Sequence, residues 1–208
     1  MKYTILTMAS LVLAAGTAVA DPMNQPTDWS GNYIGIGLSY SDGSYDAENN
    51  FTPPDATGVL GSAIVGRNYQ QDRLVYGGEL VLNFGNIEER STGGCGVGAA
   101  GCRSTIEQYA AIRGRVGYTF NQTLVFMTLG IATDRQDQRA FGINAAGDSQ
   151  RHYGYTVGIG VEQDIADDWS IRGDLEYYDF NSRTYSFLGG TSIDPDTTAV
   201  RFSLVKRF

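Results

Sequence analysis

The sequence predicts an all-β fold, an eight-stranded antiparallel up-and-down β-barrel that spans a membrane. In most of its candidate strands large apolar side chains alternate with small or polar ones, the period of a β-strand with two different faces. Short and long connections follow one another in strict alternation, as in a meander whose two ends face different compartments. After residue 20 no apolar run approaches the roughly 18 residues of a membrane helix, so only a closed barrel could cross a bilayer.

The first 20 residues have the pattern of a secretory signal peptide. Lys2 provides a positive start, an apolar stretch follows, and Ala18-Val19-Ala20 forms a small-residue cleavage site before Asp21. We therefore expect residues 1–20 to be removed and residues 21–208 to form one exported domain.

Composition excludes several function classes. Of the 15 basic residues, Lys2 leaves with the signal peptide, so 14 basic residues face 23 acidic ones and the formal charge is −9. An acidic chain repels phosphate backbones, so no nucleic acid is expected as a partner. The only lysine after the signal peptide is Lys206, which leaves P-loop and Schiff-base chemistry without their usual residue.

Four strands are expected in the first half of the chain, at residues 29–40, 58–69, 73–84 and 105–118. In the first, every second residue from Ile34 to Tyr40 is large and apolar, with glycine or serine between. Proline and glycine in residues 41–56 end it with a long loop, whereas a tight turn at 70–72 joins the second strand to the third. A second long loop, residues 85–104, precedes the fourth strand.

Four more strands are expected at residues 123–132, 151–163, 169–180 and 197–208. Tight turns at 121–122 and 164–168 alternate with long loops at 133–150 and 181–196. The strand 123–132 is apolar on both faces, so its orientation stays open. A strand of about eleven residues, tilted by roughly 40°, covers about 28 Å, close to the apolar thickness of an outer membrane.

Aromatic residues near the expected strand ends suit the two interfacial girdles of a membrane barrel. They are Trp29, Tyr40, Tyr118, Tyr153, Trp169 and Phe208.

Nine charged residues share the strand face opposite the large apolar side chains: Glu79, Glu107, Arg113, Arg115, Glu162, Arg172, Asp174, Glu176 and Arg201. Arginine facing lipid at mid-bilayer costs about 2–4 kcal/mol, so this face is expected to line the interior. Because side chains nearly fill an eight-stranded barrel, we expect paired acids and arginines that plug the lumen. An ion or proton path is the functional alternative.

The two cysteines, Cys95 and Cys102, lie close together in a glycine-rich loop of an exported chain and are expected to form a local disulfide. Such a ring would contribute about 2–3 kcal/mol. Two cysteines and one distant histidine make a poor zinc site, and the acidic loops lack the regular spacing of an EF-hand, so no metal or cofactor is expected.

Catalysis has little support in the sequence. The single histidine, His152, is expected at a loop-strand junction, exposed to solvent. Ser149 could approach it, but no lipase-like spacing accompanies the pair, so no enzyme activity is expected.

Four segments carry a family resemblance: Asp28 to Gly35, Tyr76 to Leu80, Gly154 to Glu162, and the terminal Phe208. Together they resemble the small outer-membrane β-barrel family, also called the opacity or porin family, related in architecture to the OmpA transmembrane domain. The resemblance implies a Gram-negative outer membrane, surrounding lipid, and delivery by periplasmic chaperones. It also implies that the barrel-assembly machinery reads the closing strand, through Phe202, Leu204 and Phe208.

Three functions follow as hypotheses. The first is a structural or surface-interaction protein that acts through four extracellular loops, with both termini in the periplasm and an unidentified loop partner. The second is a narrow general-diffusion porin. The third is a soluble lipocalin-like binder, whose apolar side chains would instead line a ligand cavity inside the barrel.

Overall fold

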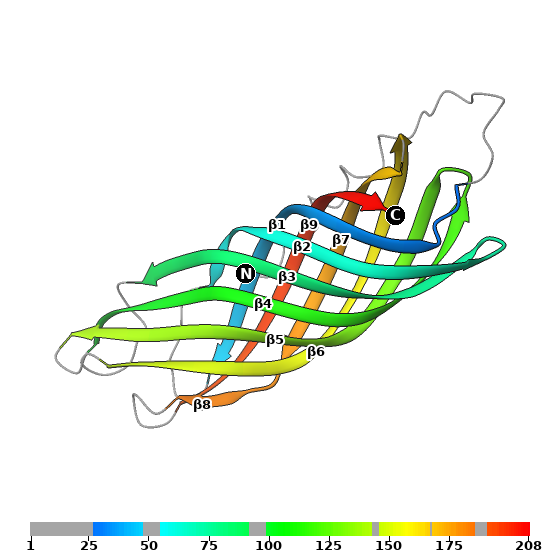
Figure 1. Ribbon diagram of the computed structural model, residues 1–208. Helices are drawn as coiled ribbons and strands as arrows, with labels where there is room; N and C mark the ends of the chain where they lie inside the picture. The colour runs from blue at the N-terminus through cyan, green and yellow to red at the C-terminus, as the bar shows by residue number, and fades with distance from the viewer. Residues whose placement is uncertain (1–26, 48–54, 92–98, 143–145, 167, 186–190) are drawn as a thin grey trace, which may run out of the picture.

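The computed structural model describes residues 27–47, 55–91, 99–142, 146–166, 168–185 and 191–208, which form one closed antiparallel β-barrel (Figure 1). Its strands are β1 (Gly31–Ala47), β2 (Ala56–Gln71), β3 (Leu74–Ser91), β4 (Ala99–Phe120), β5 (Thr123–Gly142), β6 (Ala146–Ala166), β7 (Trp169–Phe180), β8 (Arg183–Tyr185) and β9 (Thr191–Arg207). β9 pairs back with β1 and closes the ring. The short β8 pairs with β9 beyond the end of β7, so the predicted eight-stranded, up-and-down barrel is confirmed.

The register determines how narrow the barrel is. Hydrogen-bonded partners followed once around the ring from Tyr33 lead back to β1 at Gly43, ten residues further along. This offset of about 33 Å, across eight strand spacings that total about 38 Å, tilts the strands by roughly 40° and gives a backbone radius of about 8 Å. An interior of that size has room for side chains and little else.

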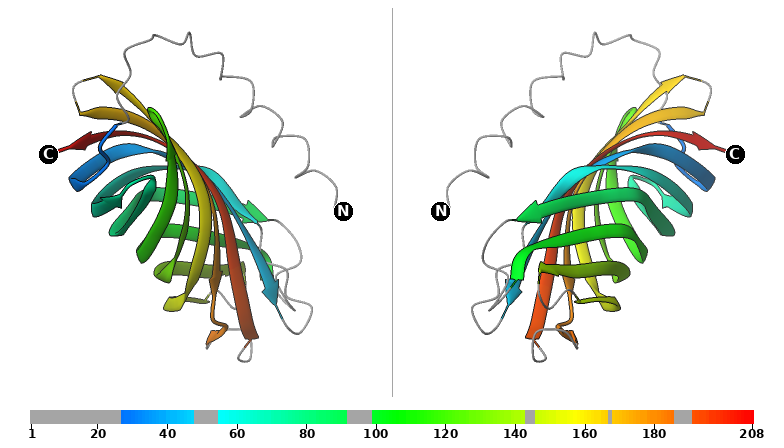
Figure 2. Two further views of the ribbon diagram at one scale, coloured as in Figure 1. Left: turned by 90° about the vertical axis from the view of Figure 1, so that its right-hand side faces the viewer. Right: turned by 90° about the vertical axis from the view of Figure 1, so that its left-hand side faces the viewer.

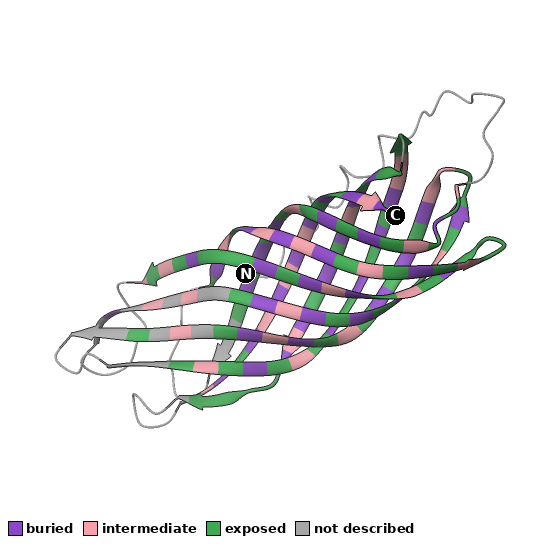
Figure 3. Ribbon diagram, viewed as in Figure 1, coloured by how far each residue is buried: buried purple, intermediate pink, exposed green. Residues whose placement is uncertain are grey.

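The two faces of the wall have opposite character (Figure 3). Large apolar residues point outward and are exposed, for example Ile36 at 69% and Leu38 at 62%, whereas the interior is lined by small, polar and charged residues. The predicted faces are therefore confirmed. The open orientation of 123–132 is also resolved, because Val125, Met127, Leu129 and Ile131 point outward. None of the described residues forms a helix long and apolar enough to cross a membrane.

The predicted long loops 41–56, 85–104, 133–150 and 181–196 were wrong, because strands occupy much of each. β4 has 22 residues and rises about 55 Å along the barrel axis, roughly twice the apolar band of an outer membrane. Beyond that band the outward residues become polar, as Arg135 and Arg139 do in β5, but the hydrogen-bonded ladder continues. Apolar alternation thus marks only the lipid-facing half of these strands.

Tight turns gather at one end of the barrel, called here the turn end. Their first or last residue adopts a left-handed backbone, with φ of 54° at Asp72, 55° at Asn121 and 68° at Asp168. Asn and Asp tolerate this conformation better than other non-glycine residues. The predicted turn 70–72 lies one residue later, at Asp72–Arg73. Phe208 pairs with Asn32 at the same end, and the opposite end is called the far end.

Outward aromatic side chains form two belts that bracket the apolar band. The belt near the turn end comprises Tyr69, Tyr76, Tyr118, Phe120, Trp169 and Phe208, and the belt toward the far end comprises Tyr40, Phe84, Tyr153, Tyr155 and Tyr177. Belts of this kind mark the two membrane interfaces. Five of the six predicted girdle residues lie in them, and Trp29 does not.

Closure of the barrel depends on a close approach between β1 and β9. A Cβ added at Gly37 would lie 2.8 Å from Cα of Ser203 and collide with the Phe202 carbonyl, whereas one added at Gly78 would meet nothing nearer than 3.9 Å. We expect Gly37→Ala to lower the free energy of unfolding by about 1–3 kcal/mol. Gly78→Ala, the matched control, should change it by less than about 0.5 kcal/mol. Urea unfolding in lipid vesicles measures both, and equal effects would contradict the closure geometry.

Candidate functional site

The charged residues predicted for the interior come from both walls of the barrel. Eight of the nine point inward with 4% or less of their surface exposed: Glu79, Arg113, Arg115, Glu162, Arg172, Asp174, Glu176 and Arg201. The ninth, Glu107, sits where the pairing of β4 with β5 is irregular, and its side chain lies outside the described part of the structure.

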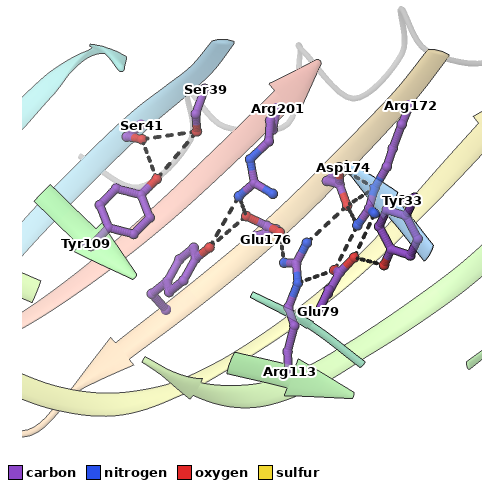
Figure 4. Close-up of polar contacts among 11 residues, drawn as sticks. Tyr33, Ser39, Ser41, Glu79, Tyr109, Arg113, Arg172, Asp174, Glu176 and Arg201 are labelled. Carbon is purple, nitrogen blue, oxygen red and sulfur yellow. Dashed lines mark hydrogen bonds and ion pairs between the residues drawn. The ribbon is translucent and has the colours of Figure 1, made fainter. Parts of the chain in front are cut away.

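Glu79 is the centre of this set (Figure 4). Arg113, its cross-strand partner on β4, places Nε 2.5 Å from Oε1. Arg172 of β7, four strands away around the ring, places Nη1 2.8 Å from Oε2 and Nη2 2.9 Å from Oε1. The Tyr33 hydroxyl donates to Oε2 at 2.6 Å. Side chains from opposite walls therefore meet at one carboxylate.

Two further carboxylates on β7 extend the network toward the far end. Asp174 Oδ1 accepts from Arg172 Nη2 at 2.7 Å and lies 3.5 Å from Arg113 Nη2. Glu176 pairs with both Arg113 and Arg201 and accepts from the Tyr178 hydroxyl at 2.8 Å. Arg113 of β4 thus contacts three carboxylates on two other strands, β3 and β7.

A second ion pair lies closer to the turn end. Arg115 Nη2 donates to Glu162 Oε2 at 2.6 Å, and Ser170 Oγ donates to the other carboxylate oxygen at 2.6 Å. The guanidinium of Arg115 lies 3.9 Å from the ring centre of Phe126, which Arg172 also approaches, at 4.5 Å. The aromatic ring therefore contacts two cations, a favourable interaction in a dry interior.

The charges of the network balance, with four arginines and four carboxylates among the eight described members. Removing one partner of a buried pair typically costs about 3–5 kcal/mol, because the remaining charge is uncompensated. The bidentate contact of Arg172 with Glu79 also fixes geometry, since a planar guanidinium matches a carboxylate in only a few orientations. The network is thus a rigid crossing of the lumen.

Trp29 lies at the turn end inside the barrel, so its predicted place in the outer girdle was wrong. It is 0% exposed and packs with Val75, Leu124 and Phe126. Its indole Nε1 donates to Thr119 Oγ1 at 2.9 Å, and its backbone N–H donates to the side chain of Gln70 at 2.7 Å. Trp29 began the predicted strand 29–40 and was assigned to the girdle from its place at the strand end, but it precedes β1 in the structure.

His152 corrects a second expectation, because it is buried rather than exposed to solvent. It lies within β6, beyond the predicted strand start, and its Nδ1 is 3.0 Å from the carbonyl oxygen of Asn181. Ser149 is exposed on the outer face, where its Oγ accepts from Arg135 Nε at 3.4 Å. Alternation thus places serine and histidine on opposite faces of the same strand, away from one another.

The remaining predicted features are the disulfide, the assembly signal and the lack of a metal site. Cys95 and the side chain of Cys102 lie outside the described residues, so their disulfide stays a prediction. Phe202, Leu204 and Phe208 point outward, 61%, 41% and 68% exposed. Within the described ranges no group of three His, Cys, Asp or Glu side chains could hold a metal ion.

Comparison with known proteins agrees with this architecture. The model of the outer membrane protein β-barrel domain matches residues 7–208, nearly the whole chain. The chain belongs to this family. The protein therefore resides in the outer membrane of a Gram-negative cell, with its apolar belt in lipid. A soluble lipocalin-like barrel is excluded by this location.

Relatives in the family are named as outer-membrane proteins. The 22 kDa outer membrane protein of Rhizobium leguminosarum bv. viciae is 28% identical, over 90% of this chain and 82% of its own. The 31 kDa outer-membrane immunogenic protein of Brucella melitensis is also 28% identical, over 88% of this chain and 89% of its own. Among solved structures, OprG of Pseudomonas aeruginosa is similar with a TM-score of 0.53 at 12% identity, covering 86% of this chain and 96% of that one.

Sequence reasoning missed several neutral members of the interior. Tyr33, Ser170 and Tyr178 each donate a hydroxyl to a network carboxylate, and Phe126 stacks under two arginines. Their inward parity was a usable signal, because a tyrosine on the charged face of a strand needs a partner for its hydroxyl. Which carboxylate the hydroxyl contacts depends on the register of the strands and could not be derived from the sequence.

The central crossing generates a stability prediction. We expect Arg172→Met to lower the free energy of unfolding by about 3–5 kcal/mol, because Glu79 and Asp174 lose a shared cation. Arg73→Met, in an exposed turn, serves as the matched control and should stay within about 0.5 kcal/mol. Urea titration followed by tryptophan fluorescence measures both, and an Arg172 effect no larger than that of the control would contradict the pairing.

Proposed function

We propose that this protein is a closed-lumen outer-membrane barrel with a structural or surface-interaction role and no enzyme activity. The observation that supports the proposal best is the contact of Arg172 with Glu79, which joins opposite walls inside a barrel of about 8 Å backbone radius. Trp29 fills the interior below that contact. Two successive layers of packed side chains would leave no continuous water path.

In this proposal the turn end faces the periplasm and the far end faces outward. Short turns and chain termini belong on the periplasmic side of small outer-membrane barrels, and longer connections on the other. Four connections at the far end, with the strand extensions that carry them, would then meet an unidentified extracellular partner. The separation of Ser149 from His152 supports the absence of serine hydrolase chemistry.

The proposed partners during biogenesis are periplasmic chaperones and the barrel-assembly machinery. The outward positions of Phe202, Leu204 and Phe208 on the closing strand support this, because the three side chains share one apolar face of β9. That face is available before β9 pairs with β1. A narrow general-diffusion porin is the alternative function. It requires a water path where the structure has the Arg113, Arg172 and Glu79 crossing.

Conductance tests the closed lumen. We expect purified wild-type protein in planar bilayers to show no stable open level, because both layers of side chains obstruct the lumen. Single-channel recording measures this. A reproducible, large conductance from the wild-type protein would replace the structural role with the porin alternative.

The assembly signal is tested by removing one outward aromatic ring. We expect Phe208→Ala to reduce the fraction of protein that reaches the folded form, seen in cells as the faster-migrating band of unboiled membranes on a gel. Phe120→Ala, an outward aromatic at the same end with 56% exposure, is the matched control and should leave that fraction unchanged. Equal losses would assign the effect to the lipid contact of any girdle residue.

A further inference from the structure

Beyond the lipid band the barrel wall carries five arginines on one side, called here the Arg wall: Arg90, Arg103, Arg135, Arg139 and Arg151. Arg90, Arg103 and Arg139 lie directly opposite one another on β3, β4 and β5, and Arg135 lies opposite Arg151. Cross-strand partners point to the same face, so these guanidinium groups share the outer surface.

Two described acidic side chains lie among the arginines of this wall. Glu88 lies 2.8 Å from Arg90 and 3.1 Å from Arg103, and Asp137 lies 2.9 Å from Arg139. The described outward side chains of this wall therefore keep a net charge of +3, from five arginines and two acids. Like charges directly opposite one another on a sheet are destabilising. An anionic partner would relieve this repulsion.

The opposite side carries five carboxylates, called here the Asp wall: Asp42, Asp55, Asp179, Asp194 and Asp196. Asp179 lies directly opposite Asp196. Hydroxyl groups donate to two members of this wall, Thr57 to Asp42 at 2.8 Å and Tyr155 to Asp179 at 2.8 Å. Burial, together with the negative charges of Asp42 and Asp196, raises the pKa of Asp55. One described arginine, Arg183 on β8, lies near this wall.

The two walls overlap in height and lie on opposite sides of the barrel. Arg151 lies two residues from Tyr153 and Asp179 two residues from Tyr177, each on the far-end side of that residue of the far aromatic belt. In the ring β4 and β5 are four strands away from β9 and β1, and Figure 1 shows β3 to β5 passing in front of β7 and β9. Figure 2 shows the barrel from two further sides. Both walls therefore begin just above the lipid surface.

We propose that the Arg wall of one copy binds the Asp wall of a second copy, so that barrels associate side by side in rows. The membrane holds every copy upright, which brings the two walls to equal height without further orientation. Lipid tails are as apolar as the outer belts, so the membrane-embedded surfaces give little drive for association, and the charged walls supply it. Because the contact joins two different surfaces on opposite sides of the barrel, it repeats into open rows and not into closed rings. The proposal does not depend on whether the lumen is closed.

The experiment uses two charge-reversal variants of the whole mature protein. One is Arg135→Glu with Arg151→Glu, which changes the net charge of the Arg wall from +3 to −1. The other is Asp42→Arg with Asp194→Arg and Asp196→Arg, which changes the net charge of the Asp wall from −5 to +1. Donor-labelled and acceptor-labelled copies are placed in phosphatidylcholine vesicles free of anionic glycolipid, and energy transfer between copies is measured. Heat-dependent gel mobility verifies that each sample is folded before energy transfer is measured. Arg73→Glu, at the turn end, is the matched control.

Wild-type copies should transfer energy well above random mixing and lose that excess at high salt, which screens exposed charges. Each variant alone should fall to the random value, because its two walls then have the same sign. A mixture of the two variants should restore transfer, and Arg73→Glu should match the wild type.

Three results would overturn the proposal. They are wild-type transfer at the random level, undiminished transfer in either variant alone, and a variant mixture that stays at the random level. If the Arg-wall variant instead only retains less phosphate-bearing glycolipid when purified from outer membranes, the Arg wall binds lipid phosphates and not a second copy.

Discussion

The requirement that charges inside a narrow barrel be paired is the constraint on which the interior depends. Eight strands with an offset of ten residues leave a backbone radius of about 8 Å, so a long side chain from one wall reaches the other. Arg172 and Glu79 use that reach. Glycines and hydroxyl-bearing residues at the remaining inward positions give these large side chains space and hydrogen-bond donors.

The character of the outward side chains changes with the environment at each height along the barrel axis. Between the aromatic belts, lipid requires apolar side chains, and beyond the far belt water permits Arg135, Asp137 and Asp179 on the same outward parity. The backbone hydrogen bonds between strands do not depend on whether lipid or water surrounds the side chains. The strands therefore continue as an extension of the barrel. Contacts at the far end would therefore involve ordered sheet as well as connections.

Strand parity made much of this architecture predictable. Ile34 to Tyr40, and the alternation of Glu176 with Tyr177, assign inside and outside without knowledge of the fold. Contacts across the lumen were not predictable, because Arg172 contacts Glu79 only as a result of the register of the strands that lie between them. Strand ends beyond the lipid lost the apolar signal, which placed His152 at a loop-strand junction exposed to solvent, whereas it is buried within β6. Trp29 was assigned to the girdle because it began the predicted first strand, whereas in the structure it precedes β1 and packs in the interior.

A double-mutant cycle between Glu79 and Arg172 tests the central claim most directly. Free energies of unfolding would be compared for Glu79→Gln, Arg172→Met and the combined variant in lipid vesicles. Paired charges across the lumen predict a coupling energy of roughly 2–3 kcal/mol, with the double variant more stable than the sum of the single losses indicates. Additive losses, with coupling below about 0.5 kcal/mol, would mean that the two side chains do not hold the opposite walls together.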